Sequence, residues 1–115
     1  MSKQTNIHDF VDRLIVLTNE DKCKWGYTID KDFRLLLKSG SVILSAVYDE
    51  AYEDFDYALS LYDSTDCFAT YRYSIAEEGK ESAMWNKLQD LHIAINNSEN
   101  RIIESKISQL FEELG

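Results

Sequence analysis

Apolar side chains recur every three or four positions near the start of the chain, over residues 7–19. This is the spacing of one buried helical stripe, and Val11 and Leu14 lie near its centre. Either Thr5 or Asn6 is placed to cap the first turn through its side-chain oxygen. The pattern therefore predicts a helix over residues 7–19.

Apolar and polar positions then alternate with a period of two, from residue 23 to about residue 74. Alternation of this kind is typical of strands with one buried face. The connections are short, and Ser39-Gly40 has the composition of a tight hairpin connection. Segment 24–29 is either a fifth strand or an extended entry to the sheet. The pattern predicts an antiparallel meander with strands over residues 32–38, 41–48, 56–62 and 67–73.

Helical spacing returns in the last third of the chain, where it predicts two helices, over residues 79–97 and 99–113. Asn96-Asn97-Ser98 separates them, because these residues favour helix ends and turns. Ser74 and Glu77 form a capping-box pattern, so the first of the two can begin earlier. One side of the terminal helix is apolar, with Ile103, Ile107, Leu110, Phe111 and Leu114. This helix can leave the body and pair with a copy of itself or with another chain.

Strands grouped in the middle of the chain, with helices at both ends, indicate the α+β class. The predicted architecture is an N-terminal helix, a four- or five-stranded antiparallel meander sheet and two C-terminal helices in a single domain, residues 1–115. The length suits one domain, and 44% hydrophobic residues suffice to bury a core. We expect helices to cover one face of the sheet and the other face to be partly open to water.

The formal net charge is −9 at pH 7, and it disfavours two classes of partner. Neutralising phosphates requires clustered Lys and Arg, so direct nucleic-acid binding is not expected. Docking on an anionic membrane surface is disfavoured for the same reason. A basic protein surface remains compatible with this charge. A cytoplasmic location is predicted, because no apolar run approaches the roughly 20 residues of a membrane span and residues 1–6 lack the apolar stretch of a signal peptide.

Motifs that carry familiar catalytic chemistry are missing from the sequence. It contains no glycine-rich phosphate loop, no G-x-S-x-G turn and no H-E-x-x-H pair. Its two histidines and two cysteines are not paired at the close spacings of a zinc site. We expect Cys23 and Cys67 to be small core residues and His92 to border the core. The sequence thus predicts a non-enzymatic protein without a metal or a cofactor.

The densest charge lies in the segment YDEAYEDFDY, residues 48–57. Its carboxylates account for more than half of the net charge and belong to Asp49, Glu50, Glu53, Asp54 and Asp56. A calcium loop is not expected, because the segment has no glycine and no D-x-D-x-D spacing. One interpretation is a long solvated connection over Asp49–Asp56, with Phe55 tucked beneath it.

The other interpretation is a surface that binds a partner. Carboxylates on the loop would steer a basic protein, while Tyr52 and Phe55 would supply apolar contact area. Tyrosines on the neighbouring strands would extend the loop into one acidic, tyrosine-rich surface if they face water. The candidate partner-binding residues are Asp49, Glu50, Tyr52, Glu53, Asp54, Phe55, Asp56, Tyr62, Tyr71 and Tyr73.

Three functions remain open on the sequence. The first is a small acidic protein-binding module, such as an inhibitor, an immunity protein or a bacterial or phage-type modulator. It would occupy a basic partner surface, for example that of a nucleic-acid-binding protein. The second is a structural or adaptor subunit that homo-oligomerises, as a dimer for instance, through its C-terminal helices. The third is a small-ligand-binding or enzymatic domain with a pocket between sheet and helices.

Overall fold

The structure is a computed structural model, and it describes residues 6–115. One antiparallel sheet has the strand order β1-β2-β3-β4-β5, so each strand pairs with the next along the chain. The predicted α+β class and the antiparallel meander are confirmed, and segment 24–29 supplies the fifth strand. The elements in order are α1 (Ile7–Asn19), β1 (Trp25–Tyr27), β2 (Phe33–Leu37), β3 (Gly40–Asp49), β4 (Asp54–Asp63), β5 (Asp66–Tyr73), a 3₁₀ turn (Gly79–Glu81) and α2 (Ala83–Glu113).

The first helix begins and packs as its sequence predicts. The Asn6 side-chain oxygen accepts a hydrogen bond from the Asp9 backbone N–H at 2.9 Å, which satisfies one of the free donors of the first turn. The alternative cap, Thr5, lies outside the described residues. Val11 and Leu14 are buried on the face turned towards the sheet and α2.

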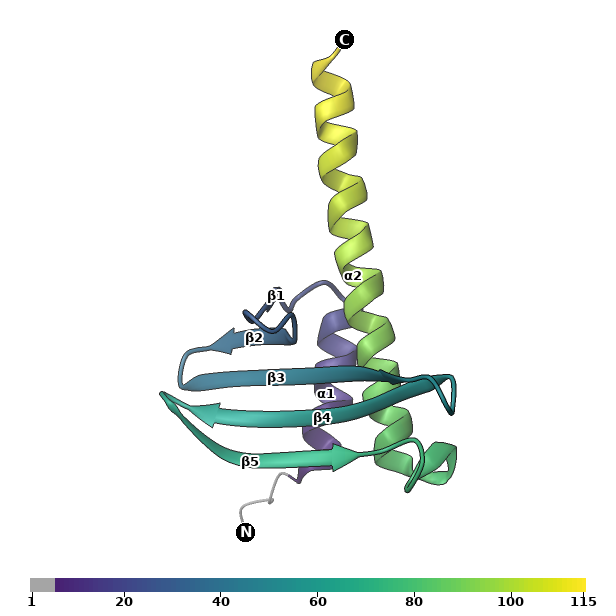
Figure 1. Cartoon of the computed structure of the whole chain (residues 1–115). Coiled ribbons are helices and arrows are strands. Elements are labelled where there is room, and N and C mark those ends of the chain that lie inside the picture. The colour runs from purple at the N-terminus through teal and green to yellow at the C-terminus, as the bar shows by residue number, and fades with distance from the viewer. Residues whose placement is uncertain (1–5) are drawn as a thin grey trace.

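Both helices lie on one face of the sheet and form a two-layer domain with it (Figure 1). Alternation along each strand directs every second side chain to the helices, so that Leu44 and Leu59 are fully buried between the layers. The opposite face carries smaller or more polar side chains, such as Ser45 and Ser60, which are only half-buried. Within residues 6–115 no helix covers that face (Figure 1). The core side chains come from every layer: Val11, Leu14, Cys23, Leu35, Val42, Leu44, Tyr57, Leu59, Ile75, Met84, Trp85, Leu88, Leu91 and Ile95.

Gly40 is required by the close approach of two strands. It is the first residue of β3 and pairs with Asp63 of β4. A Cβ atom added at Gly40 would lie 1.9 Å from the carbonyl oxygen of Tyr62, which is backbone and cannot swing away. Glycine therefore lets the β2–β3 and β4–β5 turns meet at the same end of the sheet.

The prediction of a long connection over Asp49–Asp56 is wrong. Strand β3 continues to Asp49 and β4 begins at Asp54, so the connection contains only residues 50–53. Tyr48 pairs with Phe55 within the sheet, and Glu53 adopts a left-handed backbone conformation with φ +52°. A dense run of carboxylates resembles a loop in composition, but aromatic residues between them favour strand pairing.

The prediction of two C-terminal helices is also wrong, because α2 runs without interruption for 31 residues. Ser98 is buried, and its hydroxyl donates to Asp21 at 2.7 Å, while Asn96 and Asn97 lie on the exposed side. The low helix propensity of these residues costs only about 0.7 kcal/mol each, and packing outweighs it. The helix also begins later than predicted: its cap is Ser82, whose hydroxyl accepts from the Trp85 backbone N–H at 3.2 Å.

The last part of α2 projects beyond the edge of the sheet at β1 (Figure 1). We call residues 99–115 the arm; from residue 100 onward every residue is exposed. The radius of gyration is 16.1 Å, against about 13 Å for a compact chain of this size. The arm thus accounts for the elongated shape of the molecule.

Candidate interaction surfaces

Three of the five predicted binding carboxylates hold the local fold. The Asp49 carboxylate accepts from the backbone N–H groups of Ala51 and Tyr52 at 2.9 and 3.3 Å. The Asp56 carboxylate accepts from the Ile75 N–H at 2.8 Å. The Asp54 carboxylate lies 3.8 Å from the ammonium group of Lys80. These contacts order the hairpin and the chain that enters α2.

The predicted aromatic residues do not gather on one surface. Phe55, Tyr71 and Tyr73 are half-buried and pack against the core. Alternation along β4 places Tyr62 on the opposite face of the sheet from Leu59. What remains exposed together is the tip of the β3–β4 hairpin, which we define as Glu50, Tyr52 and Glu53. That these residues bind a partner stays a prediction, and it now rests on the tip alone.

A polar and aromatic cluster lies between the sheet and α2. The Tyr57 hydroxyl and His92 Nδ1 are 3.0 Å apart, and the Trp85 indole N–H donates to the Phe55 carbonyl at 2.9 Å. The His92 ring meets those of Phe33, Phe55 and Tyr57 with centroids 5.0–5.6 Å apart. Burial raises the pKa of the Tyr57 hydroxyl, with a smaller contribution from Asp54, and burial lowers the pKa of His92. The expected position of His92 at the core boundary is confirmed.

His92 makes folding stability depend on pH. Its folded pKa lies below the unfolded value of about 6.5, so the unfolded chain binds the proton more readily. The stabilisation is present above pH 6.5 and is lost as the pH falls below it, by at most about 1.4 kcal/mol per pH unit. We expect the urea midpoint to decrease between pH 7.5 and pH 5.5, and this decrease to be smaller in His92→Gln.

The matched control for this prediction is His8→Gln, because His8 is exposed on α1. This variant should keep the wild-type change in urea midpoint. Equal changes in His92→Gln and the wild type would show that His92 contributes nothing to it.

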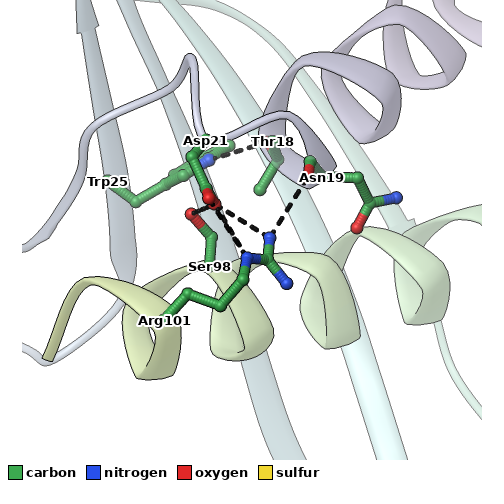
Figure 2. Close-up of polar contacts among 6 residues, drawn as sticks. All are labelled: Thr18, Asn19, Asp21, Trp25, Ser98 and Arg101. Atoms are coloured by element: carbon green, nitrogen blue, oxygen red, sulfur yellow. Dashed lines mark hydrogen bonds and ion pairs between the residues drawn. The ribbon is translucent and has the colours of Figure 1, made fainter. Parts of the chain in front are cut away.

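Hydrogen bonds fix the base of the arm to the end of α1 (Figure 2). Figure 2 shows the Arg101 side chain reaching from α2 to Asp21, whose carboxylate it meets at 2.8 Å through Nη2 and 3.1 Å through Nε. Arg101 also donates to the Asn19 carbonyl at 3.2 Å, and Ser98 donates to Asp21. The backbone of Asp21 adopts a left-handed conformation with φ +59°. The hydrogen bonds from Arg101, and then from Ser98, lower the pKa of Asp21.

Two further contacts hold β1 near this network. The Trp25 indole N–H donates to the hydroxyl of the fully buried Thr18 at 3.1 Å (Figure 2). The Tyr27 hydroxyl donates to the Glu99 carboxylate at 2.6 Å, and this bond raises the pKa of Tyr27. The arm therefore leaves the body in a direction that α1, β1 and α2 determine together.

The arm presents an apolar stripe to solvent. Its members are Ile103, Ile107, Leu110 and Leu114. They follow one another at intervals of four, three and four residues, which keeps them on one helical face. Between 46% and 83% of each side chain is exposed. Phe111 lies beside the stripe and is 74% exposed. The sequence marks this stripe as apolar, but the predicted break before residue 99 hides its continuity with the body.

Two grooves of the described domain adjoin its helices. One, of about 520 Å³, is lined by apolar residues of α1 and the sheet, including Phe10, Leu61 and Phe68. The other, of about 630 Å³, lies between β1 and the base of the arm. That a small ligand occupies the first groove stays a prediction.

Within residues 6–115 no three His, Cys, Asp or Glu side chains lie close enough to hold a metal ion. Neither described helix has the length of apolar sequence that a membrane span requires. Cys23 is buried as expected, but Cys67 is exposed on β5, which corrects its prediction as a core residue.

Comparisons of the chain with protein-family models, curated proteins and solved structures found no match in any of the three.

Proposed function

We propose that the protein is a non-enzymatic structural or adaptor subunit that self-associates through its arm. The observation that carries this proposal is the exposed stripe of Ile103, Ile107, Leu110 and Leu114 on a helix whose base is hydrogen-bonded to Asp21. Contiguous apolar surface of this kind marks interaction sites in soluble proteins. The α+β domain would then be the part that the assembly presents to its surroundings.

The size of the stripe suits a reversible association. Burying half of the exposed stripe in each of two copies would contribute roughly 4–8 kcal/mol before costs. Association itself costs about 4–15 kcal/mol in lost motion. The gain exceeds the cost by about 4 kcal/mol at most, so we expect a weak association with a dissociation constant on the order of millimolar.

Sedimentation equilibrium of the full chain tests this proposal. The average mass should rise from 13.4 kDa towards twice that value between about 10 µM and about 2 mM protein. A mass of one chain throughout this range would remove self-association as the function.

We propose as a second candidate that the hairpin tip binds a basic protein. Glu50 and Glu53 are exposed beside Tyr52, which offers both charge and contact area. A basic partner captured from the native host at low salt should be lost at high salt and lost by Glu50→Gln/Glu53→Gln. The charge-matched control is Glu104→Gln/Glu112→Gln, which should retain it. If the tip variant captures the partner as well as the control does, the tip is not the binding site.

A further inference from the structure

The apolar stripe of the arm continues the side of α2 that faces the sheet. Ile103 follows Trp85 by 18 residues, which is five turns of helix, and Leu110 follows His92 by the same interval. Trp85 and His92 both contact Tyr57 on β4. A helix seated on the stripe therefore lies in the layer of the sheet, just beyond the edge strand β1.

This placement conflicts with a parallel pair of arms. In a parallel pair the second copy's α2 would run from its arm down the same side, into the space that β1 to β5 occupy (Figure 1). Each copy would meet the other's sheet in this way. In-register parallel pairing would also bring Glu99 close to Glu104 of the second copy, and both are negative.

An antiparallel pair avoids both conflicts. Pairing Ile107 with Leu110 of the second copy, and Ile103 with its Leu114, closes the stripe of each arm on the other. The second copy's domain then lies beyond the far end of the first arm. The groove between β1 and the arm base, lined in part by Ile103 and Lys106, would receive the end of the second arm.

The charges beside the stripe match this arrangement. Antiparallel pairing places Lys106 of each copy next to Glu113 of the other, on the same flank of the stripe. Neither side chain has an ion-pair partner within residues 6–115 of its own chain. The last turn of α2 contains no basic residue, so Glu113 lies unopposed at the negative end of the helix dipole. Lys106 of the second copy would supply the missing positive charge.

We infer that the arm binds the arm of a second copy in antiparallel orientation over residues 103–114, with the two α+β domains at opposite ends of the pair. This inference rests on the proposed self-association and adds its geometry. The partner surface is thereby defined as the same stripe on the second copy, flanked by Lys106 and Glu113.

Cysteine cross-linking tests the orientation in the full chain. In a Cys67→Ser background, which removes the exposed thiol, Ile103→Cys and Leu114→Cys are made separately. Under mild oxidation the mixture of the two should form a disulfide-linked dimer, and neither variant alone should. Within an antiparallel pair two copies of residue 103 are 11 residues apart along the axis, or about 16 Å, too far for a disulfide.

Charge reversal provides a second measurement that needs no cysteine. Lys106→Glu should raise the dissociation constant roughly tenfold, and Lys106→Glu/Glu113→Lys should restore it to within about threefold. The control Lys106→Glu/Glu112→Lys has the same net charge and should not restore it, because Glu112 lies off the flank.

The outcomes separate this inference from the proposed function. Linkage of Ile103→Cys with itself, or an associated protein that the Glu113 reversal does not rescue, overturns the antiparallel geometry and leaves self-association standing. A protein that sediments as a single chain overturns both.

Discussion

Replacing Ile107 and Leu110 with glutamine should convert the associated protein into a monomer. Both residues lie in the middle of the stripe and are 59% and 63% exposed in the single chain. Each substitution occurs in both copies, so four apolar side chains lose their burial at about 0.5–1 kcal/mol each. The dissociation constant should therefore rise by a factor of about 30 to 1,000, which sedimentation equilibrium would register as a single-chain mass.

The matched control for this variant is Ser105→Gln/Ser108→Gln. Both serines are exposed on the side of the arm away from the stripe, and glutamine is a good helix former at all four positions. The control should associate like the wild type. Circular dichroism should show equal helix content in both variants, so that a loss of association cannot be attributed to unfolding of the arm. If the Ile107/Leu110 variant still associates, the stripe is not the interface.

Trp85→Ala should destabilise the domain more than any other single substitution considered above. Trp85 is fully buried, its ring lies 5.7 Å from that of Tyr57, and its indole N–H satisfies the Phe55 carbonyl. Removing it leaves a cavity and an unpaired carbonyl, at a cost of about 3–5 kcal/mol. A domain of this size has a total stability of about 5–15 kcal/mol, so the urea midpoint should fall by a large fraction.

Trp85→Phe is a milder change at the same position. It keeps a six-membered ring in the core and removes the hydrogen-bond donor with the rest of the indole, so we expect a smaller cost of about 1–3 kcal/mol. Urea unfolding followed by circular dichroism measures both variants. A loss below about 1 kcal/mol in Trp85→Ala would show that α2 is held to the sheet by other contacts.

The sheet could be predicted from the sequence because one of its faces is buried. Burial of one face forces alternation, and Leu59 and Ser60 fall on opposite faces as their order along β4 implies. The first helix was equally predictable, since its stripe and its Asn6 cap are local features. The strands and the first helix were therefore predicted correctly from the spacing of their buried positions.

The parts that sequence could not predict depend on contacts between distant residues. Asn96, Asn97 and Ser98 read as a break because their local preferences are weak, but Ser98 bonds to Asp21, which is 77 positions away in the chain. The orientation of the strand tyrosines has a similar cause. Alternation assigns Tyr71 and Tyr73 to one face of β5, but it does not say whether that face is the one that α1 and α2 cover.

The bonds from Arg101 to Asp21 make the direction of the arm depend on the position of the end of α1. About 20 Å of helix extends from Arg101 to Leu114, so a tilt of about 5° at the base would move the tip by about 2 Å. Small changes in how the end of α1 packs would thus be magnified into changes in the spacing of whatever the arm joins.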